Sequence, residues 1–91
     1  MRLEGKVAVV TAVGKQTGMG RGIARVLAGE GADLALNSAS TASVDEAVAE
    51  VRALGRRAVG VAGDAASRAV CEELVRAATH DLGGLDSLVC N

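Results

Sequence analysis

The sequence predicts a doubly wound α/β fold, in which helices cover both faces of a parallel sheet. Three observations predict it: strand-like and helix-like segments alternate along the chain, the connections between them are short, and the first strand-like run is almost wholly apolar. A strand that is buried on both faces of a parallel sheet has this apolar character. The alternation β-α-β-α-β-α-β therefore indicates one domain over residues 1–91, with parallel strands and right-handed crossovers.

The first strand and the first helix are predicted on either side of a glycine-rich stretch. The apolar run KVAVVT at residues 6–11 is short and ends just before the glycines begin. Over residues 21–30 the period changes, because Ile23, Val26 and Leu27 fall on one face of a helix. We therefore expect a strand over 6–11 and a helix over 21–30.

The second strand is expected over residues 33–37, and a serine-rich loop leads from it into the second helix. Ser43 and Glu46 have the S-x-x-E spacing of a capping box, which predicts that this helix begins at Ser43. Gly55 ends the pattern, because glycine commonly terminates a helix.

The third helix and the last strand complete the alternation. A strand over 58–62, which contains Gly60, precedes a helix that begins at Ser67 and ends at Gly83. One face of this helix is apolar at a spacing of four residues: Val70, Leu74, Ala78 and Leu82. Residues 85–90 are then expected to form the fourth strand.

Composition and charge exclude several classes of function. The chain has no Phe, Trp or Tyr on which a base could stack, and its net charge of -1 gives no attraction to nucleic acid or to an acidic membrane. No segment has the roughly 18 apolar residues that a membrane span needs. Cys71 and Cys90 lie far apart and outside any C-x-x-C spacing. We therefore expect buried free thiols in a reducing cytoplasm, without a disulfide or a metal site.

Gly14, Gly18 and Gly20 lie between the first strand and the first helix, where a chain can bind a phosphate. The first amides of a helix have no partner within the helix, and the helix dipole favours an anion near them. Glycine lets a phosphate approach because it has no Cβ. We therefore expect the backbone amides at residues 18 and 20 to hold the diphosphate of a dinucleotide. The alternative is that the glycines only form a turn and let the helix pack close to the sheet.

The glycine spacing and its surroundings resemble the short-chain dehydrogenase/reductase family. GKQTGMG at residues 14–20 is similar to the TGxxxGxG fingerprint, LEGKVAVVT to the family's first strand, and RGIARVLAGEGADL to its first helix and second strand. GDAAS resembles the segment that carries an adenine-binding Asp, and LDSLVCN resembles the start of the LVNNAG strand. The resemblance implies a partial Rossmann-like fold with strand order 3-2-1-4. It also implies transfer of a hydride between NADP(H) and a small-molecule carbonyl or alcohol substrate.

The sequence departs from the family pattern in two places. Thr11-Ala12 stands where the family has Thr-Gly, with two residues inserted before Gly18. Cys90 replaces the first Asn of the NNAG motif, and Asn91 matches the second.

Carried over residue by residue, the resemblance implies a set of cofactor-binding residues at the glycine turn and at the strand ends. They are Gly14, Lys15, Thr17, Gly18, Met19, Gly20, Asn37, Ser38, Asp64, Ala65 and Asn91. The Asp64 carboxylate would accept a hydrogen bond from the adenine amino group. Alternatively, Asp64 is only an acid beside the predicted N-cap Ser67, favoured there by the dipole of the third helix.

The residues after the second strand favour NADP over NAD. Enzymes that select NAD usually have an acidic residue there, which binds the ribose 2′-OH, whereas residues 37–40 read NSAS. Ser38 and Ser40 could donate hydrogen bonds to a 2′-phosphate, and Lys15 or Arg21 could supply positive charge. The alternative is that the serines only begin the next helix.

The family's catalytic group is a Tyr that acts as general acid/base, assisted by a Lys and a Ser. This chain has no tyrosine, so we expect no catalytic residue and no turnover in these 91 residues. His80 has no visible partner, and a catalytic role for it is not expected. The chain resembles the N-terminal nucleotide-binding part of a longer enzyme that is often a homo-oligomer. A non-catalytic dinucleotide-binding module and another α/β class, such as a methyltransferase, remain alternatives.

The fourth strand raises an expectation about behaviour in solution. Placed beside the first strand, it would be an apolar strand at an exposed edge of the sheet. We therefore expect the isolated chain to be marginally stable and prone to association.

Overall fold

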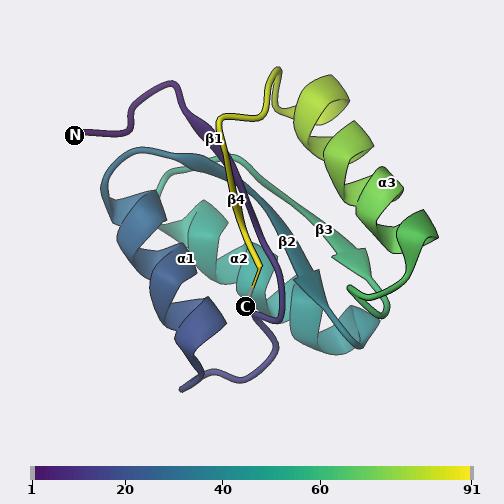
Figure 1. Ribbon diagram of the computed structural model, residues 1–91. Coiled ribbons are helices and arrows are strands. Elements are labelled where there is room, and N and C mark those ends of the chain that lie inside the picture. The colour runs from purple at the N-terminus through teal and green to yellow at the C-terminus, as the bar shows by residue number, and fades with distance from the viewer. Residues whose placement is uncertain (1, 91) are drawn as a thin grey trace.

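The computed structural model describes residues 2–90, which form a four-stranded parallel sheet (Figure 1). The strands are β1 Val7–Val10, β2 Asp33–Ser38, β3 Ala58–Ala62 and β4 Ser87–Val89. They lie in the order β3-β2-β1-β4, and every neighbouring pair is parallel. The predicted fold class and strand order are therefore confirmed.

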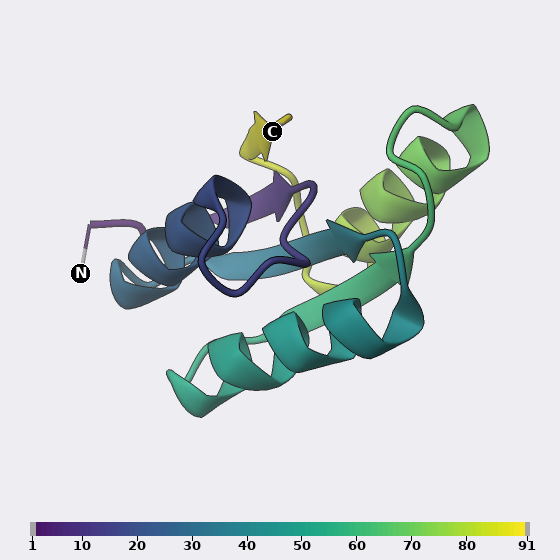
Figure 2. The same ribbon diagram turned by 90° about the horizontal axis from the view of Figure 1, so that it is seen from below.

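Helices cover both faces of the sheet (Figures 1 and 2). One face carries α1 Met19–Gly29 and α2 Thr41–Ala53; the other carries α3 Arg68–Arg76 and the π-helical turn η1 Ala77–Asp81. Residues of β1 alternate between the two layers: Ala8 and Val10 pack with α1 and α2, whereas Val7 and Val9 pack with α3 and η1. All four side chains are at most 3% exposed, which explains why the run is apolar throughout.

Small residues let α1 lie close to the sheet. Gly20, Ala24 and Ala28 are buried at a spacing of four residues, and they form the inner face of the helix. Val26, which the periodicity grouped with Ile23 and Leu27, is 66% exposed and lies on the outer face. The helix is where the sequence predicts it, but its buried residues are Gly20, Arg21, Ala24 and Ala28, whereas Ile23 and Leu27 are only partly buried.

The second helix begins earlier than predicted. Its N-cap is Ser40, whose Oγ accepts a hydrogen bond from the Ser43 N–H at 3.2 Å. The capping box at Ser43 and Glu46 is therefore wrong: Ser43 is the third residue of α2, and the Glu46 carboxylate binds Arg21. Several serines in this loop are each able to cap a helix, so spacing alone selects the wrong one.

The third helix changes its winding after Arg76. The Thr79 hydroxyl donates hydrogen bonds to the carbonyls of Val75 at 2.9 Å and of Arg76 at 3.2 Å, and the chain widens here into the π-helical turn. Ser67 is the N-cap, as predicted, although its side chain makes no capping hydrogen bond in the described structure. Three of the predicted apolar positions are buried despite the change in winding: Leu74, Ala78 and Leu82.

Gly60 lies within β3 because α2 crosses the strand at close range. A Cβ on Gly60 would lie 2.9 Å from Val44 Cγ2 and 3.0 Å from Val48 Cγ2, both shorter than a normal van der Waals contact. The glycine thus allows the close packing of α2 on this strand rather than interrupting it.

Both cysteines are exposed, which corrects the prediction of buried thiols. Cys71 lies on α3, where its thiol donates to the Ala65 carbonyl at 3.1 Å, and Cys90 follows β4 at the edge of the sheet. Both cysteines line a hollow between α3 and β4. Over the same residues, no helix is long and apolar enough to cross a membrane, and no cluster of metal-binding side chains is found.

Candidate cofactor-binding site

A hollow lies where β1 and β2 end, beside the first turn of α1. Its volume is about 520 Å³, and it is lined by Ala12, Gly14, Lys15, Gly18, Met19, Ser38, Ala39 and Ser43. It brings together these predicted binding residues: Gly14, Lys15, Gly18, Met19 and Ser38. The carboxyl edge of an open parallel sheet is where such folds bind their ligands.

Among the described residues, the first backbone amides of α1 have no protein partner. Gly18 is the N-cap, and its own N–H donates to the Lys15 carbonyl at 3.0 Å. The expectation that the Gly18 amide holds a diphosphate is corrected by this bond, which closes the turn internally. Met19 and Gly20 follow, and within the described residues no hydrogen bond from their N–H groups is found. Together with the helix dipole, these two amides favour an anion.

At two of the glycines a Cβ would come close to a neighbouring atom. A Cβ on Gly14 would lie 2.5 Å from Ser38 Oγ, and a Cβ on Gly18 would lie 3.1 Å from Lys15 Cβ. Side chains at these positions would push Ser38 aside or open the turn. The remaining turn residue of the predicted set, Thr17, is exposed and lies outside the lining of the hollow.

Three serine hydroxyls gather at the end of β2 and the start of α2. Ser43 Oγ forms hydrogen bonds with Ser38 Oγ and with Ser40 Oγ, the second at 2.7 Å. Ser43 and Ser38 line the hollow, whereas Ser40 is exposed and caps α2. Ser43 was missed as a site residue because the sequence assigned it to the helix cap. The sequence offers no signal for this role, because Ser40 and Ser43 are both able to cap the helix.

Asn37 is not available to a ligand, although the sequence places it in the site. Its side chain is buried, and Oδ1 accepts a hydrogen bond from the Ala12 N–H at 3.3 Å. Its Nδ2 donates to the carbonyls of Val61 at 3.1 Å and of Gly63 at 3.0 Å. Both amide hydrogens are thus used within the protein. Asn37 ties together the ends of β1, β2 and β3, and the prediction that it binds a cofactor is corrected.

Arg21 is also unavailable as a charge for a ligand phosphate. The sequence offered it as a cation for the 2′-phosphate, but the side chain is 1% exposed. Its guanidinium binds two main-chain carbonyls and the carboxylates of Glu46 and Glu50. Glu50 is half-buried and bonded to both Arg21 and Arg25. Lys15 is therefore the cation in the lining of the hollow.

Asp64 and Ala65 follow β3, apart from the lining of the hollow. Asp64 is exposed, and its Oδ1 accepts a hydrogen bond from the Ala66 N–H at 2.9 Å. Ala65 lines a different, mainly apolar hollow of about 300 Å³, which Cys71 and Cys90 also line. Asn91 lies outside the described residues.

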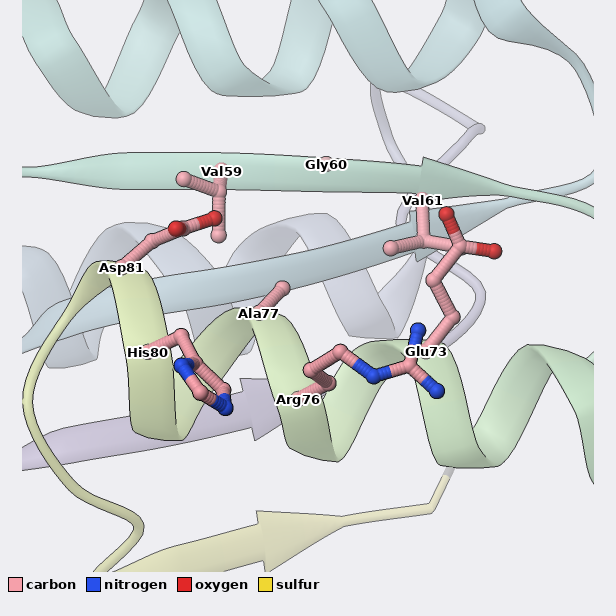
Figure 3. Close-up of a pocket in the computed structure, with 8 residues that line it drawn as sticks. All are labelled: Val59, Gly60, Val61, Glu73, Arg76, Ala77, His80 and Asp81. Atoms are coloured by element: carbon pink, nitrogen blue, oxygen red, sulfur yellow. The ribbon is translucent and has the colours of Figure 1, made fainter.

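His80 lies in a third hollow, on the opposite face of the sheet from α1 and α2. This hollow is about 310 Å³ and lies between β3 and the α3–η1 segment (Figure 3). Four polar side chains reach it from the helical side: Glu73, Arg76, His80 and Asp81. In the described part of the chain, no hydrogen bond or ion pair joins His80 to a neighbour, and nothing there organises it for acid–base chemistry.

Residues 6–91 match the family model described as short chain dehydrogenase. The chain is 42% identical over 90 residues to the L-rhamnose 1-dehydrogenase (NAD(P)(+)) of Sphingomonas sp. (strain SKA58), covering 98% of this chain and 35% of that protein. It is 45% identical over 94 residues to a hydroxyacyl-CoA dehydrogenase of Mycobacterium tuberculosis (strain ATCC 25618 / H37Rv), covering 98% of this chain and 29% of that protein. The chain thus spans about a third of the length of the curated relatives it matches.

Solved structures agree with this match. A short chain dehydrogenase from Burkholderia cenocepacia J2315, in complex with NADP, superposes with a TM-score of 0.86 at 38% identity, over 97% of this chain and 36% of that one. A hydroxysteroid dehydrogenase from Escherichia coli superposes with a TM-score of 0.89 at 32% identity, over 99% of this chain and 37% of that one. With the strand order, the glycine turn and the family match in agreement, the chain belongs to the short-chain dehydrogenase family.

Proposed function

We propose that this chain is the NADP(H)-binding part of an oxidoreductase that moves a hydride between the nicotinamide and a carbonyl or alcohol substrate. The observation that carries the proposal is the hollow at the ends of β1 and β2, which the first turn of α1 and two serine side chains line together. Family membership supports the class of reaction.

The residues of the hollow fit a dinucleotide. Gly14 and Gly18 leave the space that a Cβ would fill, so a diphosphate can approach the backbone. The amides of Met19 and Gly20, which have no partner among the described residues, and the positive end of the α1 dipole would bind its oxygens. When bound, the nicotinamide would supply the hydride, while the residues of this chain would hold and orient the dinucleotide.

Hydroxyl groups without a neighbouring carboxylate support NADP over NAD. The lining includes Ser38, Ser43 and Lys15, and none of the described residues that line it is Asp or Glu. Hydroxyl and ammonium groups donate hydrogen bonds to a phosphate, whereas a carboxylate would repel it. One structural relative is described with NADP, and one curated relative takes either cofactor, according to their names.

Titration of the purified chain with NADPH and with NADH tests the proposal. We expect NADPH to bind at least about tenfold more tightly, which corresponds to about 1.4 kcal/mol. A tenfold preference for NADH would reverse the choice of cofactor, and failure to bind either dinucleotide would overturn the assignment of the site.

Substitution of Ser38 tests whether this residue binds the 2′-phosphate. Ser38→Asp places a carboxylate at the end of β2, and we expect it to lower NADPH affinity by about tenfold or more while changing NADH affinity much less. Ser38→Asn has a similar volume without the charge and is the control. An equal loss in both variants would mean that the effect is steric.

A non-catalytic dinucleotide-binding module, which needs no tyrosine, is the second candidate. Both candidates bind NADPH, so binding does not separate them. A reading frame that continues beyond Asn91 into a Ser and a YxxxK motif would support the enzyme. The 91 residues alone are expected to bind NADPH without detectable oxidation in the presence of a carbonyl compound.

A further inference from the structure

Arg21 is the largest fully buried side chain in the described structure, and it connects the glycine turn to α2. Nε donates to the Val13 carbonyl at 2.8 Å, and Nη2 reaches the Gly14 carbonyl at 3.4 Å. Nη1 binds Glu50 Oε1 at 2.9 Å, and both terminal nitrogens bind Glu46 Oε1 at 3.2 Å. Burying a guanidinium is costly unless its donors are bonded, and here each nitrogen has a partner.

The two carbonyls that Arg21 binds belong to the turn that borders the hollow. Gly14 lines the hollow, and Val13 precedes it. A carbonyl oxygen carries partial negative charge, so a carbonyl turned toward the hollow would repel a diphosphate. Because Arg21 is buried, the oxygens that bind it are directed into the protein.

The carboxylates on the other side of Arg21 come from the helix that carries Ser43. Ser43, Glu46 and Glu50 stand at i, i+3 and i+7 of α2 and therefore share one face of the helix. Arg25, on α1, also binds Glu50, which fixes this carboxylate from a second side. The Arg21 guanidinium thus fixes the position of the glycine turn relative to α2, the helix that carries Ser43.

We propose that Arg21 is a positioning residue for dinucleotide binding: it turns the Val13 and Gly14 carbonyls away from the hollow and fixes the diphosphate end of the site. The proposal rests on the proposed function, because it assumes that the hollow receives a dinucleotide. It assigns Arg21 no contact with the ligand.

A role in stability alone would predict a different pattern of binding. If Arg21 only stabilised the packing of α1 against α2, its loss would lower the affinity for all ligands to a similar degree, or would leave all affinities unchanged. If it positions the turn, its loss affects ligands with a diphosphate and spares those without one. NADPH and adenosine 2′-monophosphate separate the two cases, because both carry the 2′-phosphate and only NADPH carries the diphosphate.

The experiment compares Arg21→Met with Arg52→Met in the purified chain. Arg52 is the matched control, because its guanidinium also binds a main-chain carbonyl, that of Ala58 at 2.9 Å, at the far end of α2. We expect R21M to lower the affinity for NADPH by about tenfold, the order of one lost charge-assisted contact. The affinity for adenosine 2′-monophosphate should change less than about twofold. R52M is expected to leave the affinity for both ligands unchanged.

Equal losses for both ligands in R21M, or unchanged NADPH binding, would overturn the proposal. Arg21→Lys is the milder variant if R21M does not fold; it keeps a cation but cannot bind both carbonyls and both carboxylates, so the same selective loss is expected at a smaller size. Amide hydrogen exchange without ligand gives an independent result. R21M or R21K should speed exchange of the Gly18 amide, and R52M should not; unchanged exchange contradicts the proposal. Wild-type protein that binds no NADPH would instead overturn the proposed function.

Discussion

Ala12 has a φ of 56°, the one positive φ of a non-glycine residue among residues 2–90. This left-handed conformation brings the Cβ of an L-residue close to a carbonyl oxygen and costs about 1–2 kcal/mol, whereas glycine adopts it freely. The short-chain dehydrogenase pattern described above has glycine at this place. The departure from the family pattern is therefore accommodated by backbone strain at the rim of the site.

Replacing Ala12 with glycine should raise the stability of the protein. Relief of strain is partly offset by the greater freedom of glycine in the unfolded chain, so we expect a net gain of about 0.5–1 kcal/mol. Urea unfolding followed by circular dichroism measures it. Ala39→Gly is the control, because Ala39 also lines the hollow without a positive φ and should lose stability. A less stable A12G protein would contradict the prediction, because the strain at Ala12 would then be smaller than the entropic cost of the added glycine.

The glycine turn and the buried first strand could be predicted from the sequence, because each depends only on residues that are close together along the chain. Gly14 and Gly18 are needed wherever a backbone must come close to another group, and the spacing places them after a strand and before a helix. The hydrogen bonds that make the side chains of Asn37 and Arg21 unavailable to a ligand could not be predicted in this way. Their hydrogen bonds run to residues on other elements, which only the folded arrangement brings within reach.

At the level of elements, the sequence predicted the existence and order of helices and strands but not their ends. The alternation of apolar runs predicts a parallel sheet with helices on both faces, whereas the strand order 3-2-1-4 came from the resemblance to the family. The start of α2 was wrong because Ser40 and Ser43 compete for the same role, and the choice depends on Ser43 reaching Ser38 on β2. The π-helical turn in the third helix was not predicted, because the spacing of its apolar residues continues at four through the turn.

The ion pairs between α1 and α2 predict that the stability of the protein depends on pH. The hydrogen bond from Arg25 and then that from Arg21 lower the pKa of Glu50 below its usual value of 4.5, against the opposing effect of burial. A carboxyl with a depressed pKa in the folded state stabilises the protein above its unfolded pKa. That contribution is lost as the pH falls through the folded pKa.

Glu50→Gln should remove this dependence. We expect the variant to be about 1–2 kcal/mol less stable at pH 7, and the difference from wild type to shrink as the pH falls below about 4.5. Urea midpoints at pH 7, 5, 4 and 3 measure it. Glu72→Gln is the control, because the Arg68–Glu72 pair is exposed on α3 and contributes only a few tenths of a kcal/mol. A constant difference between E50Q and wild type at every pH would contradict the prediction.

At the scale of the whole molecule, apolar surface lies on both sides of the edge strand β4. Leu88 on β4 is 57% exposed beside the hollow that Cys71 and Val75 line, and Met19 and Val26 are exposed on α1 over the other face of the sheet. An edge strand with apolar side chains is a site for pairing with another chain. The structure thus supplies the residues through which the expected association would occur.

Leu88→Lys should reduce association of the purified chain. We expect the wild-type chain to elute with a mass above that of a monomer at micromolar concentration, and L88K to shift toward the monomer, because a lysine on an edge strand disfavours pairing. Size-exclusion chromatography with light scattering measures the mass directly. Leu54→Lys is the matched control: Leu54 is 50% exposed at the end of α2, away from β4, and its replacement should leave the mass unchanged. If L54K dissociates the protein as well as L88K does, the chain associates through general hydrophobicity rather than through the β4 edge. A wild-type chain that is monomeric at this concentration would show that neither surface is sufficient for association.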